Sequence, residues 1–212
     1  GTLFGSFDEP AGPGAGPGAW PGAAAESPAE VHRAAPNGRY ATLTDLESLD
    51  AVLERIRAAG RAAVDTETDS LHARTARLCG IAVAVASGEG FYIPVRSPEM
   101  AGHLSVDAVL DRMRPVLESP ELEILGHNLK FDLVVLRNHG VVPRGRLQDT
   151  MVADYLLEPT RSSHGMDALA ESLLGIRCVP ITDLIGARGR GRSGTPQKRS
   201  DEVPLSLAGP YA

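Results

Sequence analysis

Two short acidic runs, each preceded by apolar residues, carry side chains that could bind divalent metal. The first run contains Asp65 and Glu67, which follow the apolar residues 62–64. Those apolar residues indicate the end of a buried strand, and side chains two positions apart on a strand point to the same face. Hard cations such as Mg²⁺ and Mn²⁺ prefer oxygen ligands, and two of them about 3.5–4 Å apart can clamp the attacking and leaving oxygens of a phosphodiester. The pair therefore predicts a metal site for phosphodiester chemistry.

The second run places Asn128 and Asp132 four residues apart. If residues 129–139 form a helix that ends at Gly140, the two side chains lie one above the other, and Asp132 can point toward the first pair. Neither run is specific by itself. Acidic residues at strand ends are often solvated, and an Asn–Asp pair at this spacing can be a helix cap followed by an exposed residue.

Two further runs complete an ordered set of four motifs, in residues 64–71, 126–132, 149–157 and 164–170. With this set, the chain from Tyr40 onward resembles the 3'-5' exonuclease domain of bacterial DNA polymerase I. The resemblance implies an α/β fold of the DEDD exonuclease superfamily, with a ribonuclease H-like mixed sheet flanked by helices. It also implies a proofreading activity on single-stranded DNA 3' ends and two divalent metal ions, Mg²⁺ or Mn²⁺.

The resemblance also assigns the catalytic residues. Asp65, Glu67 and Asp132 would be metal ligands, and Tyr211 would orient the attacking water. In the family this tyrosine opens a Tyr-x-x-x-Asp motif whose aspartate is the last ligand, whereas this sequence ends at Ala212. We therefore expect a domain that is cut within its C-terminal motif. Pro210 departs from the family pattern, because proline disfavours the helix that the family has there.

Five side chains are candidates for substrate binding. They are Thr66, Leu71, Asn128, Phe131 and His164. Thr66 could offer its backbone N–H, Leu71 could wedge against the terminal base, and Phe131 could stack on a base. Structural roles fit the same residues: a plain strand position for Thr66, core packing for Leu71 and Phe131, and a hydrogen-bonded histidine at position 164.

Three further side chains in these motifs are not assigned to metal or substrate binding. His127 stands where relatives often carry glutamine, and no substrate contact is assigned to it. Asp149 is expected to cap a helix, and Asp154 is expected to lie on a helix surface.

Two other functions remain open. A ribonuclease D-type enzyme, which trims RNA 3' ends, shares the carboxylates but lacks an attached polymerase. A catalytically silent module would bind strands or support a polymerase without cleaving. The presence of Asp65, Glu67 and Asp132 speaks against the silent module, whereas the absent final aspartate leaves it open.

Composition indicates one globular domain of ordinary size, with 212 residues of which 42% are hydrophobic. Cys79 and Cys178 are expected to be reduced, since their spacing suits neither a disulfide framework nor a zinc site. No apolar run approaches the ~20 residues that span a bilayer, and no signal peptide is recognisable. We therefore expect a cytoplasmic protein without a membrane partner. The net charge of -6 disfavours a general nucleic-acid coat but permits a nuclease.

Residues 1–38 are rich in glycine, proline and alanine and are expected to be a disordered linker that precedes the exonuclease domain of residues 39–212. A polymerase domain is expected to follow. A Gly-rich segment in residues 186–200 carries basic side chains that could contact DNA or simply be solvated. They are Arg188, Arg190, Arg192, Lys198 and Arg199.

The coarse pattern predicts alternating strands and helices. Thr44 and Glu47 form a capping box for a helix that ends near Gly60, followed by a strand at 62–65. An apolar run at 78–86 and a strand at 90–95 flank a Gly-containing turn, which predicts a hairpin. Ser105 begins a further helix, and a strand at 123–126 leads into the helix at 129–139. Together they predict a mixed sheet flanked by helices.

Overall fold

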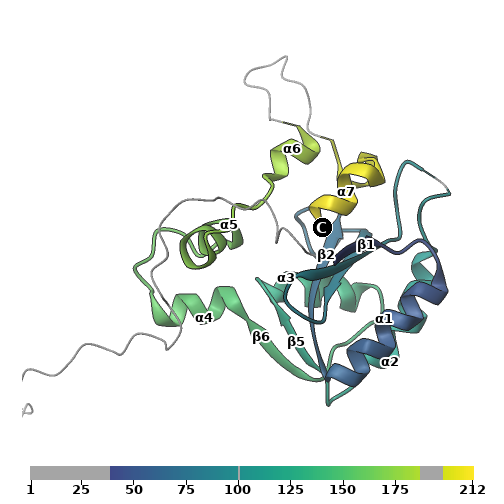
Figure 1. Cartoon of the computed structure of the whole chain (residues 1–212), viewed down its shortest axis with the longest axis horizontal. Coiled ribbons are helices and arrows are strands. Elements are labelled where there is room, and N and C mark those ends of the chain that lie inside the picture. The colour runs from purple at the N-terminus through teal and green to yellow at the C-terminus, as the bar shows by residue number, and fades with distance from the viewer. Residues whose placement is uncertain (1–38, 100, 187–197) are drawn as a thin grey trace, which may run out of the picture.

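The computed structural model describes residues 39–99, 101–186 and 198–212 (Figure 1). The expected linker at 1–38 lies outside the described residues, as do Arg188, Arg190 and Arg192. Within the described part, the chain is a mixed α/β structure, as the motifs predicted.

A six-stranded sheet forms the centre, in the order β1-β4-β3-β2-β5-β6. β2 pairs antiparallel with β3, which pairs antiparallel with β4, whereas β5 runs parallel to β2 and β6 runs parallel to β5. β1 pairs parallel with β4. The strands are β1 (Arg39–Thr42), β2 (Arg61–Thr68), β3 (Leu78–Ala84), β4 (Glu89–Pro94), β5 (Glu123–Gly126) and β6 (Arg146–Asp149).

β2 is longer than predicted and continues through the acidic run. Its register is fixed on both sides, since Asp65 pairs with Ala82 and Glu67 with Gly80 on β3, while Ala63 pairs with Leu125 on β5. The register shifts between Glu67 and Thr68, as at a β-bulge. The expected hairpin of β3 and β4 and the strand at 123–126 are confirmed.

Three helices bury their apolar sides in one core with the sheet. They are α1 (Leu46–Ala59), α2 (Val106–Leu117) and α3 (Leu129–Asn138). Leu49 and Ile56 of α1, Met113 of α2 and Val135 of α3 are each 0% exposed. The same core contains Ile81 of β3, so the helices and the sheet are held mainly by apolar burial.

The N-cap of α1 differs from the predicted capping box. Asp45 occupies the N-cap, and its Oδ1 accepts the Ser48 N–H at 2.8 Å. Thr44 and Asp45 are adjacent, and both residue types are good N-caps. The Asp45 carboxylate serves as the cap in place of the Thr44 hydroxyl. The predicted end at Gly60 is confirmed, with φ of 65°. Ser105 is the N-cap residue of α2, but its side chain makes no capping bond.

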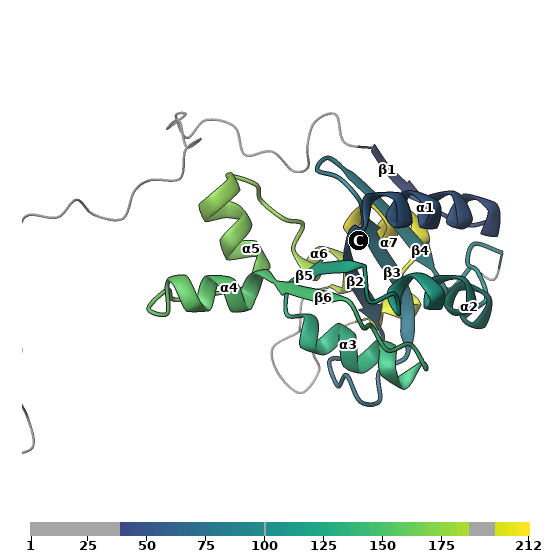
Figure 2. The same cartoon turned by 90° about the horizontal axis from the view of Figure 1, so that it is seen from below.

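The C-terminal part consists of short helical segments. They are α4 (Thr150–Leu157), α5 (Met166–Leu169), the π-helical η1 (Ala170–Leu174), α6 (Ile181–Ile185), the 3-10 helix η2 (Ser200–Glu202) and α7 (Leu205–Tyr211). α4 and α5 lie at the opposite end of the molecule from α1 and α2 (Figure 2). α7 does form a helix despite Pro210, which stands in its last turn.

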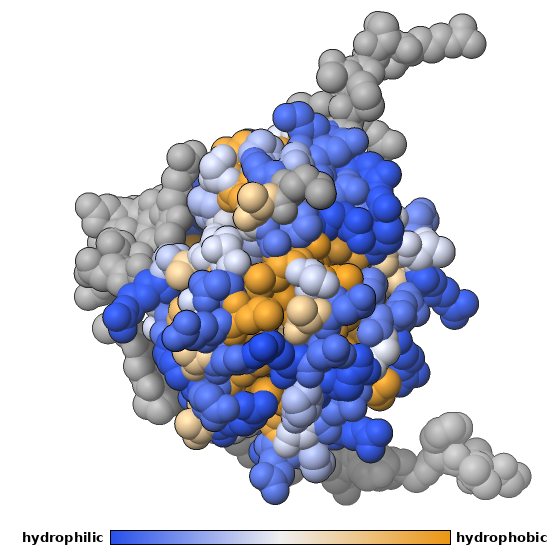
Figure 3. Space-filling model, turned by 90° about the vertical axis from the view of Figure 1, so that its right-hand side faces the viewer, coloured by the Kyte–Doolittle hydropathy of each residue, from blue (hydrophilic) through white to orange (hydrophobic). Residues whose placement is uncertain are grey.

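Apolar side chains also reach the surface. On the face shown in Figure 3, hydrophobic residues gather at the centre and hydrophilic residues surround them. On α4, Leu156 and Leu157 are each 75% exposed. None of the described helices is both long and apolar enough to cross a membrane.

Candidate active site

The acidic pair of β2 lies on one face of the central strand. Along β2 the residues alternate between more and less exposed positions, with Ala62, Val64 and Thr66 turned to the core. Asp65 and Glu67 therefore share the opposite face, as predicted. The backbone that carries the two carboxylates is paired with β3 on one side, and on the other side the Thr66 N–H between them donates to Asp132.

Burial and mutual repulsion disfavour the charged forms of these carboxylates. Burial raises the pKa of Asp65. The pKa of Glu67 is raised to about 7, first by burial and then by the negative charges of Asp65 and Asp132. Within the described residues, no Lys or Arg forms an ion pair with either Asp65 or Glu67. The pair is therefore a partly buried concentration of acidic groups, whose ionised forms a cation would stabilise.

Asp132 approaches the same strand from the first turn of α3. It is 3% exposed, and its Oδ1 accepts the backbone N–H of Thr66 at 2.9 Å and the Thr66 hydroxyl at 2.6 Å. Burial raises the pKa of Asp132 to about 6; the Thr66 bonds oppose that rise and the charge of Asp65 adds to it. The helix thus brings a third carboxylate to the strand, between the two acidic residues.

The three carboxylates do not close around a common point. Over the part of the chain that is described, no group of three or more His, Cys, Asp or Glu side chains lies close enough together to hold a metal ion. The three carboxylates therefore influence one another electrostatically without forming a closed common site. The reason is visible at Asp132, whose carboxylate is directed to the N–H and hydroxyl groups of Thr66. The chemistry of the donor set, oxygen ligands with raised pKa values, still fits a hard divalent cation.

Tyr211 lies near the acidic cluster although it is remote in sequence. It ends α7 and is partly buried. Burial raises the pKa of its phenol to about 12, and the negative charges of Glu67, Asp167 and Asp65 contribute. Tyr211 is thus close enough to both acidic residues of β2 for their charges to act on its phenol.

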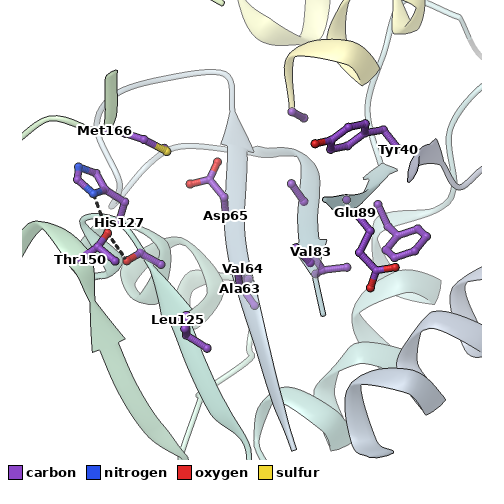
Figure 4. A pocket seen from close by; sticks show the side chains of 16 residues that line it. Tyr40, Ala63, Val64, Asp65, Val83, Glu89, Leu125, His127, Thr150 and Met166 are labelled. Carbon is purple, nitrogen blue, oxygen red and sulfur yellow. Dashed lines mark hydrogen bonds between the residues drawn. The ribbon is translucent and has the colours of Figure 1, made fainter. Parts of the chain in front are cut away.

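A cavity of about 430 Å³ opens on the face of β2 that carries Asp65. Figure 4 shows Asp65 between two walls, with His127, Thr150 and Met166 on one side and Tyr40 on the other. Ala63, Val83 and Leu125 are among the apolar residues that line it, and Ala212 at the end of α7 also contributes. The lining is therefore mostly apolar, and the acidic residues in it are Asp65 and Glu89.

Two of the substrate-binding candidates differ sharply in exposure. Leu71 is 93% exposed, in the loop between β2 and β3, so the alternative of core packing is wrong. Phe131 is partly buried and packs against the core. Thr66 is 7% exposed, and both its N–H and its hydroxyl are used by Asp132.

Asn128 and His127 form the turn between β5 and α3. Asn128 has φ of 65° and is the one non-glycine among the described residues with a positive φ. Its side-chain oxygen accepts from Lys130. The Nδ1 atom of His127 lies 2.9 Å from the Thr150 hydroxyl, which itself donates to the Gly126 carbonyl. Asparagine tolerates the left-handed conformation, because its polar side chain can bond locally.

The expected surface position of Asp154 is wrong. Asp154 is 8% exposed, and its carboxylate accepts from His164 Nδ1 at 2.6 Å and from Arg161 Nε at 3.0 Å. The His164 ring also packs edge-on against Tyr155, with ring centroids 5.1 Å apart. His164, a substrate-binding candidate, is thus held in a structural cluster. Arg161 and His164 follow Asp154 by seven and ten residues and lie beyond the end of α4. The helical periodicity of α4 therefore could not predict these contacts.

A second ionic cluster links the loop that carries Leu71 to the C-terminal segment. Asp69 accepts from Arg77 Nε at 2.6 Å and from Arg199 Nη2 at 2.5 Å, and Arg77 and Arg199 both contact Asp201. Arg199, a candidate for DNA contact, is therefore engaged with carboxylates. Asp69 belongs to the acidic run that begins on β2, but its role is set by its partners Arg77 and Arg199, and Arg199 is remote in sequence.

Comparison with known proteins supports a nuclease. A family model described as 3'-5' exonuclease matches residues 40–212. DNA polymerase I of Pseudomonas aeruginosa is 35% identical over 177 residues, which cover 82% of this chain and 19% of that protein. DNA polymerase I of Borreliella burgdorferi is 34% identical over 151 residues, which cover 70% of this chain and 16% of that protein. The chain thus spans less than a fifth of the length of these two relatives.

Solved structures share the fold. The POL domain of Pol1 from M. smegmatis, in complex with DNA primer-template and dNTP, has a TM-score of 0.54 and 23% identity, covering 66% of this chain and 23% of that one. Escherichia coli RNase D, an exoribonuclease involved in structured RNA processing, has a TM-score of 0.52 and 21% identity, covering 66% and 35%.

The mixed sheet carries its acidic pair on the central strand β2, and the family model over residues 40–212 identifies the class of protein as a 3'-5' exonuclease. Within that class, the chain belongs to the 3'-5' exonuclease family of DNA polymerase I. The predicted fold and family are confirmed.

Proposed function

We propose that this chain removes nucleotides from the 3' end of single-stranded DNA by metal-dependent hydrolysis, releasing nucleoside 5'-monophosphates. The observation that carries the proposal is the electrostatic influence of Asp65, Glu67 and Asp132 on one another, together with the burial that raises the pKa of each. A concentration of buried negative charge with no basic partner is costly unless a cation neutralises it. Family membership supplies the reaction class.

Each carboxylate has a distinct place in this proposal. Asp65 and Glu67, fixed on β2, would hold two divalent ions, Mg²⁺ or Mn²⁺, and Asp132 would complete their ligands from α3. Bound divalent ions supply a metal-activated hydroxide and charge stabilisation for the leaving 3' oxygen. Tyr211, which lies near Glu67 and Asp65, would hold the attacking water in line with the scissile bond.

The substrate would run past the exposed loop between β2 and β3. Leu71 projects into solvent there and would wedge against the terminal base. Asn128 and Phe131 stand at the start of α3 beside Asp132, and Thr66 would contribute its backbone N–H if Asp132 released it for metal. His164 would face the strand from its contact with Asp154.

We also place the chain within a larger polymerase. Residues 39–212 would serve as its exonuclease domain, with residues 1–38 as a preceding linker and a polymerase domain as the C-terminal partner. The lengths and names of the curated relatives support this arrangement. The cytoplasm, where bacterial DNA is copied, would be its compartment.

The proposal is tested by nucleotide release from labelled strands in Mg²⁺, with single-stranded DNA and RNA assayed side by side. The Asp65→Asn variant should lose at least about 100-fold in rate, because metal-ion stabilisation is worth several kcal/mol. Asp111→Asn, on the exposed side of α2, is the matched control and should retain full activity. The variants are also made in the longest chain that the gene encodes.

Three outcomes would contradict the proposal. Preferential release from RNA would identify a ribonuclease D-type enzyme. Strand binding without release in the longest chain would identify a silent module. Equal loss in Asp65→Asn and Asp111→Asn would show that the acidic pair has no special part.

A further inference from the structure

Asp149 contacts the N-termini of two helices at once. It ends β6 and serves as the N-cap of α4, where its Oδ1 accepts the N–H groups of Met151 at 2.9 Å and Val152 at 3.3 Å. The same carboxylate accepts the N–H of Asn128 at 3.0 Å through Oδ1 and the N–H of Leu129 at 2.8 Å through Oδ2. Four backbone donors from two helices therefore converge on one side chain.

The contact across to α3 replaces a cap that α3 lacks. Asn128 is the N-cap residue of α3, but its side chain makes no capping bond, and its backbone is left-handed. Unsatisfied N–H groups at a helix start normally require a side-chain acceptor. Here the acceptor comes from the neighbouring strand, where Asp149 lies opposite Gly126 in the β5–β6 register.

The charge of Asp149 suits this position. Burial acts to raise its pKa, but the bonds from Asn128, Val152, Leu129 and Met151 together hold that pKa below its ordinary value. The carboxylate is thus ionised at neutral pH, and a negative charge at a helix N-terminus is favourable.

We propose that Asp149 is a positioning residue of the active site, which fixes the start of α3 and so the placement of Asn128 and Asp132. Asp132 lies one turn after the anchored N–H of Leu129, so a shift at the start of α3 moves its carboxylate relative to Asp65 and Glu67. The inference rests on the proposed function for its catalytic consequence. The anchoring of α3 itself does not depend on that function.

The Asp149→Ser variant separates the two contacts. Serine is a good N-cap and should still serve α4, but its side chain is too short to reach across to α3 as well. Asp45→Ser is the matched control, because Asp45 caps α1 by the same chemistry in another part of the molecule. Asp149→Asn should have an intermediate effect, since an amide has a single acceptor oxygen.

Two readouts test the proposal. In the metal-free protein, amide hydrogen exchange of Asn128 and Leu129 should accelerate in Asp149→Ser, whereas that of Met151 and Val152 should change little. In the active enzyme, the Mn²⁺ concentration for half-maximal nucleotide release should rise about 10-fold, the low end of the effect of losing a residue that supports metal ligands. Asp45→Ser should leave both measurements unchanged.

Two results would overturn the inference. One is unchanged exchange at Asn128 and Leu129 in Asp149→Ser. The other is an equal rise in Mn²⁺ requirement in Asp45→Ser and Asp149→Ser, which would indicate general destabilisation. A wild-type protein without nuclease activity would contradict the proposed function alone, because the exchange measurement still decides whether Asp149 anchors α3.

Discussion

α1 and α4 both begin with an aspartate cap, yet they are held in opposite ways. α1 buries a stripe of four apolar side chains in the core, Leu49, Val52, Leu53 and Ile56. α4 buries only Asp154, while its apolar residues Leu156 and Leu157 face solvent. The sheet region is therefore stabilised mainly by apolar burial, whereas α4 is held mainly by the polar contacts of Asp154.

The difference is relevant to the proposed active site, because its parts come from both regions. Asp65 and Glu67 belong to the sheet, whereas Tyr211 belongs to the short C-terminal helices. Polar contacts are weaker and more sensitive to pH and salt than apolar burial. We expect the two regions to respond differently to substitution, pH and salt.

The largest contrast should come from truncating one apolar side chain in each helix. Ile56→Ala in α1 should lower the free energy of unfolding by about 2–5 kcal/mol, because Ile56 is 0% exposed and a cavity would remain. Leu156→Ala in α4 should change it by no more than about 0.5 kcal/mol. Urea denaturation of both variants measures the contrast, and equal losses would show that α4 is packed as tightly as α1.

The second prediction concerns pH and the sheet region. The folded-state pKa of Glu67 is about 7 against an ordinary 4.5, so the folded protein binds more protons than the unfolded chain between these values. The stabilisation is present below pH 4.5 and is lost as pH rises through about 7. Without metal, the free energy of unfolding of the wild type should fall by about 1–3 kcal/mol more than that of Glu67→Gln as pH rises from 4.5 to about 7.

The measurement is chemical denaturation of both proteins in EDTA across that pH range. Excess Mn²⁺ should reverse the loss in wild type, because a cation stabilises the ionised carboxylate. A pH dependence that is identical in Glu67→Gln and wild type would refute the assignment to Glu67.

The third prediction concerns the helical region, where the pH effect has the opposite sign. The hydrogen bond from His164, together with Arg161, holds the pKa of Asp154 below its ordinary value. The contribution of Asp154 to the free energy of unfolding is therefore present above pH 3.8 and is lost as pH falls through the lowered pKa. Asp154→Asn should accelerate amide exchange in α4 and α5 while leaving the sheet unchanged. Glu158→Gln, an exposed change at the end of α4, is the control.

The smallest effect is expected at Arg199, in the ionic cluster with Asp69 and Asp201. The Arg199 side chain is 49% exposed, so Arg199→Gln should lower the free energy of unfolding by no more than about 1 kcal/mol. The cost should fall at ~1 M salt, where exposed charges are screened. Denaturation at low and high salt measures it, and a larger cost that is independent of salt would mean that the cluster is effectively buried.

Local patterns predicted much of the sheet region correctly. The shared face of Asp65 and Glu67 follows from the two-residue period of a strand, and the hairpin follows from its Gly-containing turn. The strand at 123–126 was predicted at its observed bounds. Each of these features is decided by residues that are close in sequence.

Features that depend on distant partners could not be predicted in this way. β1 and β6 are four-residue strands whose pairing is decided by their neighbours in the sheet. Asp154 resembles a surface residue until Arg161 and His164 fold back onto it. Asp149 was predicted as a cap, but its bonds to α3 exist only because β6 lies beside β5.

The fixed register of β2 has a consequence for changes in chain length. Strand residues alternate between faces, so one residue inserted between Ala62 and Asp65 would turn both carboxylates toward α1 and α3. Substitutions in this strand should reduce nuclease activity to different degrees, whereas a single-residue insertion or deletion should abolish it. The fold should tolerate insertions in the loop between β2 and β3 far more readily, because this loop lies beyond the carboxylates. An insertion scan of residues 60–76 would therefore outline the catalytic strand by its intolerance of length change.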